Sequence, residues 1–384
     1  MISASRLAWL QLRREKVRLV IALTGVAFAV LLMSMQIGFM DALFRSAVNV
    51  HSRLLADLVI VDRGYTTLVR PIRFSRRRLY QALGFDGVAS VSPLYTGVAR
   101  WKNPATGGTR EIFILGVDPA RPALAIPGVE AALARVRYPD IVLYDEFSRP
   151  EFGPVAPIVR AGRDVVTEVS DRQVTVKALF QLGTSFGVDG SIVTSDLNFL
   201  RILPFVPRGA LSMGLIRLRP GTDAAAVQTA LARAFPHDVR VLTKQELMQH
   251  EIGYWAAATP IGFVFSFGVV MGLIVGVIIV YQILFADIAD HLAEYATLKA
   301  LGYTARYLAV VVLMEATIIA VLGYVPGVAI AWRLYALTRS ATMLPMTLTP
   351  ERGLLVLGLT LPMCWASGLI AMRKLRAAEP ADIL

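Results

Sequence analysis

Few residues in this chain have the types and spacing that covalent or metal chemistry needs. The segment from Gly183 to Gly187 reads GTSFG and matches the G-x-S-x-G pattern of serine hydrolases, with Ser185 as the nucleophile. That pattern requires a helix after the serine, and the next residues, VDG, do not begin one. The histidines lie far apart at His51, His237, His250 and His291, and neither an H-E-x-x-H motif nor a cysteine pair occurs. We therefore expect a non-catalytic chain without a metal site.

The lysines are not placed to hold a nucleotide. A P-loop needs G-x-x-x-x-G-K-[ST], so that backbone amides and the lysine can bind phosphates. No lysine in the sequence follows a glycine. We expect no cofactor in this chain, and any dependence on ATP must come from another subunit.

Glu315 is the one charged residue in the apolar run from Tyr307 to Trp332. A carboxylate inside a membrane span is unfavourable unless it meets a partner or water, which makes it a functional candidate. It lies nine residues after Arg306, or about 13 Å along a helix. We expect an intramembrane polar contact that ties spans together or senses the helix before it; a contact with substrate is the alternative.

A short two-faced helix is expected between two apolar runs. Polar residues recur there at spacings of three and four, which puts them on one face, and Gly302 is placed to end the helix. Such a helix suits a lever on which another protein pushes, whereas the alternative is a solvated connector without a special role. The residues expected to make this coupling contact are Asp287, Asp290, His291, Glu294, Tyr295, Leu298 and Lys299.

Composition places the chain between soluble and membrane proteins. Of its 384 residues, 55% are hydrophobic and 17% charged, and the mean hydropathy is +0.58. The net charge of +11 does not indicate nucleic acid binding, because most basic residues lie in a long loop that we place outside the cytoplasm. Cys364 is the single cysteine, so no disulfide framework exists.

Four uncharged or nearly uncharged runs predict four transmembrane helices. Five basic residues against Glu15 before the first run place the N-terminus in the cytoplasm, and Thr259-Pro260 offers a cap and a first-turn proline for the second run. The fold class is therefore an α-helical membrane protein with a large α+β extracytoplasmic domain between the first and second spans. The expected segments are an interfacial helix (1–16), spans at 17–40, 259–285, 307–332 and 353–372, the extracytoplasmic domain (41–255), the coupling helix (286–306), a short outer loop (333–352) and a cytoplasmic tail (373–384).

The large domain is expected to mix strands and helices, with a division into two lobes near Pro204 to Pro207. Its last part, a strand at 211–218, a helix at 222–235 and a strand at 238–242, reads as a β-α-β unit. Ser75 is expected to cap a helix over 76–83. Further strands are expected at 57–61, 90–101, 110–117, 141–144 and 173–180.

Two clusters have alternative interpretations. Glycines at four-residue spacing permit close helix packing, either at a dimer seam or within one subunit. Arg70, Arg73 and Arg76 to Arg78 form a basic cluster, either for phosphate headgroups or an acidic partner, or as a solvated helix start. The glycines are Gly268, Gly272 and Gly276 in the second span and Gly323 and Gly327 in the third.

Several segments resemble DevC-type exporter permeases of the FtsX/MacB superfamily of ABC transporters. They are RLAWLQLRREKVRL at 6–19, SVSPLYTGVARWKNP at 90–104, and YWAAATPIGF with VGVIIVYQILFADIADHLAEYATLKALGY between 254 and 303. The likeness runs nearly end to end, although residues 121–208 carry little of it.

The resemblance implies an inner-membrane homodimer with both termini in the cytoplasm. Its partners would be a cytoplasmic P-loop ATPase that carries ATP-Mg, a periplasmic adaptor protein and an outer-membrane channel, besides membrane lipid. It also implies a permease subunit of a tripartite export system that transmits ATP-driven motion and exports a lipid-like or amphiphilic substrate, a glycolipid in the DevC type. The alternative is an FtsX-like regulatory membrane protein that controls an extracytoplasmic enzyme.

Overall fold

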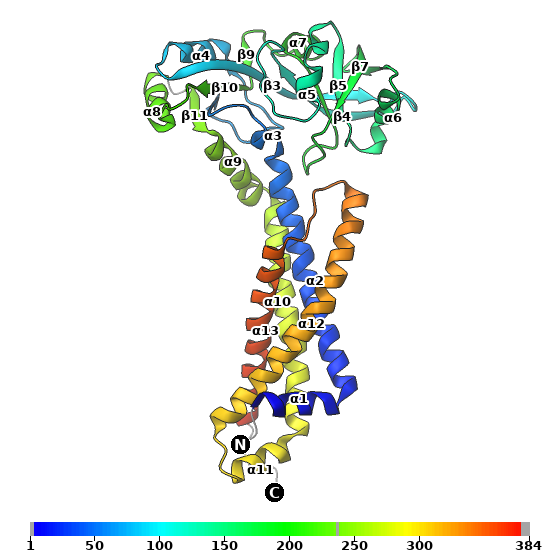
Figure 1. Ribbon diagram of the computed structural model, residues 1–384, viewed down its shortest axis with the longest axis vertical. Coiled ribbons are helices and arrows are strands. Elements are labelled where there is room, and N and C mark those ends of the chain that lie inside the picture. Colours follow the sequence, from blue (N-terminus) through cyan, green and yellow to red (C-terminus); the bar gives the residue numbers. More distant parts are fainter. Residues whose placement is uncertain (1–3, 236–237, 378–384) are drawn as a thin grey trace. The chain divides into compact units, whose positions relative to one another are not determined.

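The computed structural model describes residues 4–235 and 238–377. It divides into two compact units (Figure 1). The membrane unit comprises Met1–Asp41, Pro260–Ala341 and Met346–Leu384, and the β-rich unit comprises Ala42–Thr259 with Thr342–Pro345.

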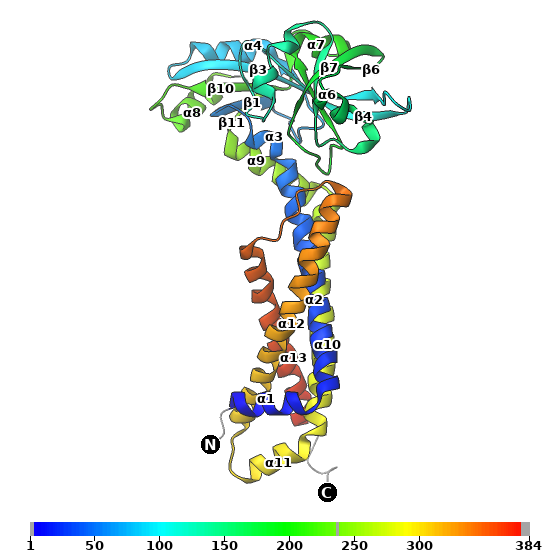
Figure 2. The ribbon, with the colours of Figure 1, turned by 45° about the vertical axis from the view of Figure 1, so that its right-hand side comes forward.

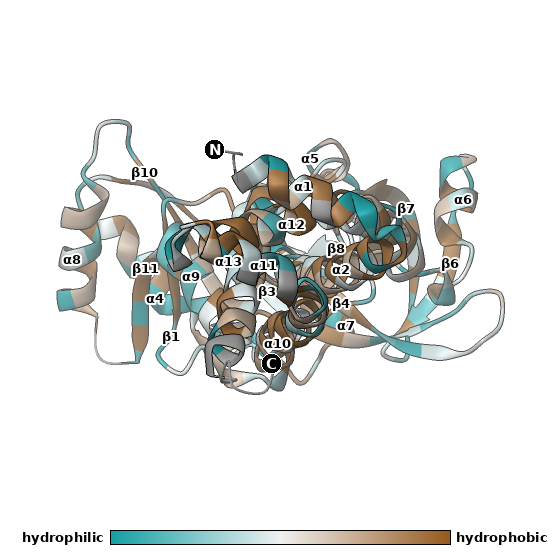
Figure 3. Cartoon of the chain, turned by 90° about the horizontal axis from the view of Figure 1, so that it is seen from below, coloured by the Kyte–Doolittle hydropathy of each residue, from teal (hydrophilic) through white to brown (hydrophobic). Residues whose placement is uncertain are grey.

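The membrane unit is helical. Its helices are α1 (Ala4–Arg14), α2 (Lys16–Ala47), α10 (Pro260–Asp290), α11 (Leu292–Ala300), α12 (Ala305–Thr342) and α13 (Pro350–Ala377). Among the described residues, α2, α10, α12 and α13 are long and apolar enough to cross a membrane (Figure 2). Figure 3 shows mainly hydrophobic colour along α10, α12 and α13.

Several helices are longer than the spans expected from the sequence. Residues 333–342, assigned above to the outer loop, continue α12, which ends where Met343 adopts a left-handed φ of 59°. The end of α10 likewise includes the first residues assigned to the coupling helix. Hydropathy reports where apolar surface stops, whereas a helix continues until a residue leaves the helical conformation, so the two boundaries differ.

The start of α10 agrees with the sequence in one respect and differs in another. Pro260 is the first helical residue, as expected for a proline whose missing N–H is not needed there. Thr259 is extended, and its hydroxyl donates backwards to the carbonyl of Trp255 at 2.7 Å. A short π-helix, η4 (Tyr254–Ala258), precedes this point.

The glycine stripes of α10 and α12 face neighbours in the same chain. A Cβ built on Gly323 would lie 2.7 Å from the Cβ of Val26 in α2, and one on Gly327 would lie 2.8 Å from that of Val30. The three glycines of α10, Gly268, Gly272 and Gly276, also approach α2, and the third approaches α13 as well. The glycine stripes therefore serve close packing within one subunit.

The β-rich unit follows α2 along the chain. Its helices are α3 (Asn49–Ser52), α4 (Arg76–Gln81), α5 (Val129–Ala132), α6 (Val155–Arg160), α7 (Asp196–Ile202), α8 (Ala224–Ala234) and α9 (Lys244–Gly253). Its strands are β1 (Leu58–Asp62), β2 (Phe74–Ser75), β3 (Val88–Lys102), β4 (Thr109–Val117), β5 (Ile141–Asp145), β6 (Val165–Val169), β7 (Arg172–Phe180), β8 (Ser191–Ser195), β9 (Ala210–Leu211), β10 (Met213–Leu218) and β11 (Val239–Thr243).

The β-rich unit has two lobes, and the long strand β3 belongs to both of them. Nine strands pair in the order β11-β1-β10-β3-β4-β8-β5-β7-β6. The first half of β3 pairs with β10, and its second half pairs with β4. One further pairing, Trp101 of β3 with Val169 of β6, closes β3, β4, β8, β5, β7 and β6 into a ring.

The first lobe, formed by β11, β1, β10 and the first half of β3, contains the expected β-α-β unit. β10 and β11 both pair antiparallel with β1, so they run parallel to each other on either side of it, and α8 connects them. Because strand side chains alternate, β1 supplies both faces: Leu58 and Ile60 join a core cluster with Leu231 of α8, whereas Val59 joins a cluster with Leu247 of α9.

The observed strands agree with those expected for the alternating runs, and Ser75 caps α4 through Arg77 N as expected. Strands β2, β6 and β8 and helices α3, α5, α6, α7 and α9 were not expected. The expected division at 204–207 marks only the return from the second lobe to the first, because the other crossing lies inside β3. A single strand that serves two lobes leaves no break in hydrophobic pattern for the sequence to reveal.

Gly327→Leu should destabilise the membrane unit, because the new side chain would meet Val30 of α2. Overpacking of this kind costs about 1–3 kcal/mol. Gly358→Leu in α13 is the matched control, since a Cβ there meets nothing within 4 Å. We expect the thermal unfolding midpoint of the detergent-solubilised protein to fall for Gly327→Leu only; equal midpoints for the two variants would contradict the packing described.

Candidate functional site

The expected coupling residues lie across the end of α10 and in α11. Asp287 and Asp290 belong to the last turns of α10, and His291 stands between the two helices. Gly302 ends this segment as expected: it has a φ of 92°, and its N–H donates to the carbonyl of Lys299 at 3.1 Å.

A cluster of charges surrounds Arg18 at the start of α2. Its guanidinium lies 2.8 Å from the carboxylate of Glu15 and 3.6 Å from that of Asp287, and it also donates to Asp290. The Asp287 side chain is only 5% exposed, whereas that of Asp290 is 58% exposed. Arg18 therefore compensates a buried carboxylate and joins α2 to the end of α10.

His291 also points inward. It is buried, and its Nδ1 lies 2.9 Å from the backbone carbonyl and 3.7 Å from the side chain of Asp287. Asp287 and His291 are thus brought together inside the membrane unit, and they do not form part of an exposed docking face.

The exposed part of this region lies on α11. The Glu294 side chain is 51% exposed and lies 3.7 Å from Arg14 of α1, and Lys299 is exposed. Leu298 is half-buried and packs against the core of the membrane unit, as expected. For Tyr295 the structure describes the backbone in α11, and its side chain lies outside the described part.

Sequence reasoning did not identify the partners of these residues. Arg14, Glu15 and Arg18 were counted only as flanking charge, and the pair between Arg352 and Asp41 at 2.5 Å was not anticipated. One signal was available for the first group, since basic residues before the first span and acids after the second lie at the same membrane face when both spans cross it.

Glu315 is fully buried in α12. Neither of its carboxylate oxygens has a hydrogen-bond partner among the described residues. Glu315 thus has no hydrogen-bonding group for its carboxylate among the residues that the structure describes.

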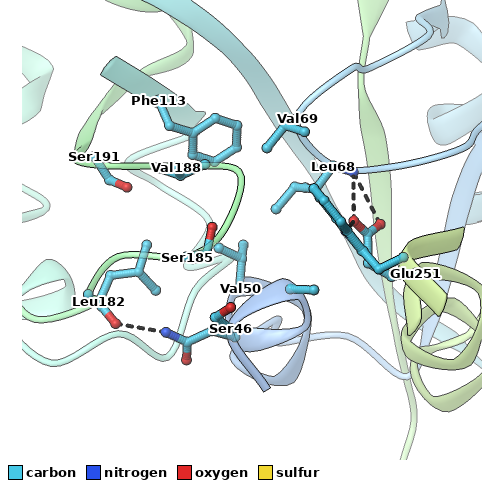
Figure 4. Close-up of a pocket in the computed structure, with 14 residues that line it drawn as sticks. Ser46, Val50, Leu68, Val69, Phe113, Leu182, Ser185, Val188, Ser191 and Glu251 are labelled. Atoms are coloured by element: carbon cyan, nitrogen blue, oxygen red, sulfur yellow. Dashed lines mark hydrogen bonds between the residues drawn. The ribbon is translucent and has the colours of Figure 1, made fainter. Parts of the chain in front are cut away.

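A second polar cluster is buried in the β-rich unit around Glu251 of α9. The carboxylate accepts hydrogen bonds from Tyr65 Oη at 2.9 Å, Thr67 Oγ1 at 2.5 Å and Trp255 Nε1 at 3.1 Å. It also accepts one from Leu68 N at 3.1 Å, which Figure 4 shows. Four donors satisfy the charge that burial would otherwise make unfavourable. We refer to these residues with His51 as the Glu251 cluster.

The Glu251 cluster joins three segments of the chain. His51 lies in α3, which follows α2, and its Nε2 is 3.1 Å from the Tyr65 hydroxyl and 3.6 Å from Glu251. Because the phenol hydrogen is used on Glu251, His51 donates to the phenol oxygen. Burial lowers the pKa of His51, an effect that the Glu251 charge partly offsets, and burial beside Glu251 raises the pKa of Tyr65 well above its ordinary value.

A small cavity of about 30 Å³ borders the Glu251 cluster. Figure 4 shows Glu251 at one side of it and Ser185 and Leu182 at the other. This volume holds a water molecule or two and is too small for an organic substrate. Ser185 lies in a loop that turns back through a bridge to Val188, so no helix follows the GTSFG motif.

Within residues 4–235 and 238–377, no group of three or more metal-ligating side chains gathers.

Comparison with known proteins gives one family match. Residues 266–380 match the model described as FtsX-like permease C-terminal. No curated protein matches the sequence.

Two solved structures are similar at low identity. The periplasmic region of MacB from Actinobacillus actinomycetemcomitans has 8% identity and a TM-score of 0.36, covering 52% of this chain and 93% of that one. The extracellular domain of the noncanonic ABC-type transporter YknZ from Gram-positive bacteria has 11% identity and a TM-score of 0.34, covering 49% and 99%. TM-scores below 0.5 do not establish a shared fold. The apolar helices and the family match indicate an integral membrane protein whose C-terminal part is similar to FtsX-like permeases.

Arg18→Gln should lower the stability of the protein in detergent, because it leaves the buried Asp287 carboxylate without its cation. Removing one partner of a buried pair costs about 3–5 kcal/mol, and the partial exposure of Arg18 reduces this to about 1–3 kcal/mol. Arg13→Gln, at an exposed position of α1, is the control. If both variants unfold at the same temperature, the Arg18 cluster is not a stabilising contact.

The stability of the folded chain should also fall as the pH drops below the pKa of an ordinary histidine. The folded state disfavours protonation of His51. When the pH falls below about 6.5, the pKa of a histidine in the unfolded chain, the unfolded chain therefore binds a proton that the folded chain does not. We expect the unfolding midpoint of the full chain to fall between about pH 7.5 and 5.5, and the fall to be smaller in His51→Gln. An identical pH dependence in the variant would exclude His51 as its source.

Proposed function

We propose that this chain is the membrane subunit of an ATP-driven export system and that a separate cytoplasmic ATPase moves it. The observation that carries the proposal is the match of residues 266–380 to FtsX-like permeases. The matched region begins inside α10 and contains α11, α12 and α13. It therefore includes the short helix between two spans as well as the spans on either side.

The proposal that a separate subunit binds ATP is supported by the absence of a nucleotide-binding motif in this sequence. No P-loop occurs, so ATP-Mg would bind to the partner and this chain would need no cofactor. The chain would act as a non-catalytic transmission element.

We propose that α11 contacts the ATPase, with fewer contact residues than the sequence suggested. Glu294, Lys299 and Asp290 are exposed and can meet a partner. Asp287 and His291 are buried, and their proposed role is to hold the end of α10 against α2. Tyr295 and Leu298 remain candidates for packing beneath the contact.

Force applied to α11 has two routes along the chain. One is α10 itself, and the other is the set of ion pairs from Glu294 and Asp290 to Arg14 and Arg18, which leads to α1 and α2. α2 is one unbroken helix from Lys16 to Ala47, and its last residues belong to the β-rich unit. The Glu251 cluster then ties α3 to α9, so the segments that follow α2 and precede α10 move together.

We propose that Glu315 links α12 to this transmission path. It is buried, and the residues next to Glu315 and Asp287, Ala316 and Ile288, belong to the same core cluster of the membrane unit. A shift of α10 against α12 would change the surroundings of both carboxylates together. A substrate contact fits less well, because Glu315 is closed off from solvent.

The remaining features of the proposal follow the resemblance stated above. The chain would be an inner-membrane homodimer with both termini in the cytoplasm and the β-rich unit outside it. A periplasmic adaptor and an outer-membrane channel would complete the export route, and the substrate would be lipid-like or amphiphilic, such as a glycolipid.

The direct test is purification of the tagged chain from its native membranes in mild detergent, with mass spectrometry and an ATPase assay of the bound proteins. Recovery of a P-loop ATPase with a periplasmic adaptor supports the export system. An ATPase recovered with a cell-wall enzyme and no adaptor supports the regulatory alternative. A folded preparation without any ATPase contradicts both.

Glu294→Lys should weaken the ATPase contact by roughly tenfold, because a reversed charge in an interface is repelled by the partner group that it formerly attracted. Glu111→Lys, a charge reversal at another exposed position, on β4, is the matched control. We expect less ATPase to co-purify with Glu294→Lys and its stimulated hydrolysis to fall, while Glu111→Lys retains both. Full recovery with Glu294→Lys would remove Glu294 from the proposed contact.

A further inference from the structure

A groove lies on the surface of α12 towards its C-terminal end. It has a volume of about 530 Å³, and its wall is mostly apolar. Val325, Val328 and Ala329 of α12 line one side, and Leu348, just before α13, contributes from the other. Trp332 and Arg333, later in α12, also line the groove. All of these residues belong to the membrane unit.

The dimensions of the groove suit part of an acyl chain. From Val325 to Arg333 the helix rises about 12 Å, which is close to the thickness of one leaflet of a bilayer core, about 15 Å. A chain laid along Val325, Val328 and Ala329 would therefore have its polar end beside Arg333. The nearby Tyr324 hydroxyl is occupied, since it donates to the carbonyl of Gly353 at 2.8 Å.

Arg333 offers an unneutralised positive charge at this end. It is exposed, and no ion pair to it occurs among the residues that the structure describes. Its guanidinium lies 5.7 Å from the centre of the Trp332 ring, which is 59% exposed. Between Glu315 and Glu351 the sequence contains no acidic residue, so no carboxylate close to Arg333 along the chain can neutralise it.

Arg333 lies near the end of a span at which basic residues are uncommon. With the N-terminus in the cytoplasm, the third span would end outside it, where basic residues near spans are disfavoured. An exposed tryptophan and arginine beside an apolar groove are suited to the level of lipid headgroups. Arginine is also the side chain that binds phosphate by paired hydrogen bonds.

We propose that this groove binds an anionic phospholipid of the surrounding bilayer, with an acyl chain along Val325, Val328 and Ala329 and the phosphate at Arg333. The proposal requires only that α12 spans a bilayer. It therefore stands or fails separately from the proposed partnership with an ATPase.

The test uses Trp332 as the reporter, because bromine on a lipid chain quenches a neighbouring indole. The full chain is reconstituted into phosphatidylcholine vesicles that contain increasing fractions of brominated phosphatidylglycerol or brominated phosphatidylcholine. The difference between the wild type and Trp332→Phe isolates the signal of Trp332. We expect half-maximal quenching at a fraction of phosphatidylglycerol at least about fivefold lower than that of phosphatidylcholine.

Three variants complete the experiment. Arg333→Gln should remove the preference for phosphatidylglycerol, whereas Arg339→Gln, an equal loss of charge outside the groove on the same helix, should retain it. Ala329→Phe should narrow the groove and reduce quenching by both lipids. Gel filtration checks that each variant remains folded.

Equal quenching of wild-type Trp332 by the two lipids would overturn the proposal, since ordinary bilayer contact would explain it. Loss of the preference in Arg339→Gln as complete as in Arg333→Gln would also overturn it, because the charge would then act at a distance. Protection of Trp332 from both lipids would mean that protein, such as a second copy of the chain, covers the groove.

Discussion

The close approach of α12 to α2 is the constraint on which the geometry of the membrane unit depends. Inside a bilayer, apolar side chains gain little by leaving lipid for another helix, so association relies on backbones that come near enough for continuous van der Waals contact. Gly323 and Gly327 permit this because the side chains of Val26 and Val30 occupy the space that their Cβ atoms would fill. The glycines of α10 do the same on another flank of α2, so α2 is the common partner.

Charged residues near the two ends of α2 form ion pairs with other helices of the membrane unit. Arg18 meets Asp287 and Asp290 at the end of α10, and Asp41 meets Arg352 at the start of α13. The Arg18 pairs join α2 to α10, as the glycines of α10 also do, and the Asp41 pair adds a link from α2 to α13. The buried members would be unfavourable alone, so any motion of α10 or α13 against α2 must carry their partners along or exchange them.

The sequence identified the spans, most strands and the position of Glu315, because each depends on neighbours within one helical or strand segment. It did not identify the partners of Asp287 or of Glu251. Asp287 lay on a polar face by spacing and was expected to meet another protein, yet Arg18, far earlier in the chain, covers it. Glu251 stood only at the edge of an uncharged run, and nothing local indicated that Tyr65 and Thr67 would donate to it.

By itself, the sequence determined the order of elements and several of their ends. Pro260 begins α10 and Gly302 follows α11, since proline geometry and a left-handed backbone are properties of single residues. Only the tertiary structure decided that the glycine stripes pack within one subunit, that Asp287 faces inward and that β3 serves two lobes. Those outcomes depend on distances between segments far apart along the chain, and periodicity within a segment carries no information about such distances.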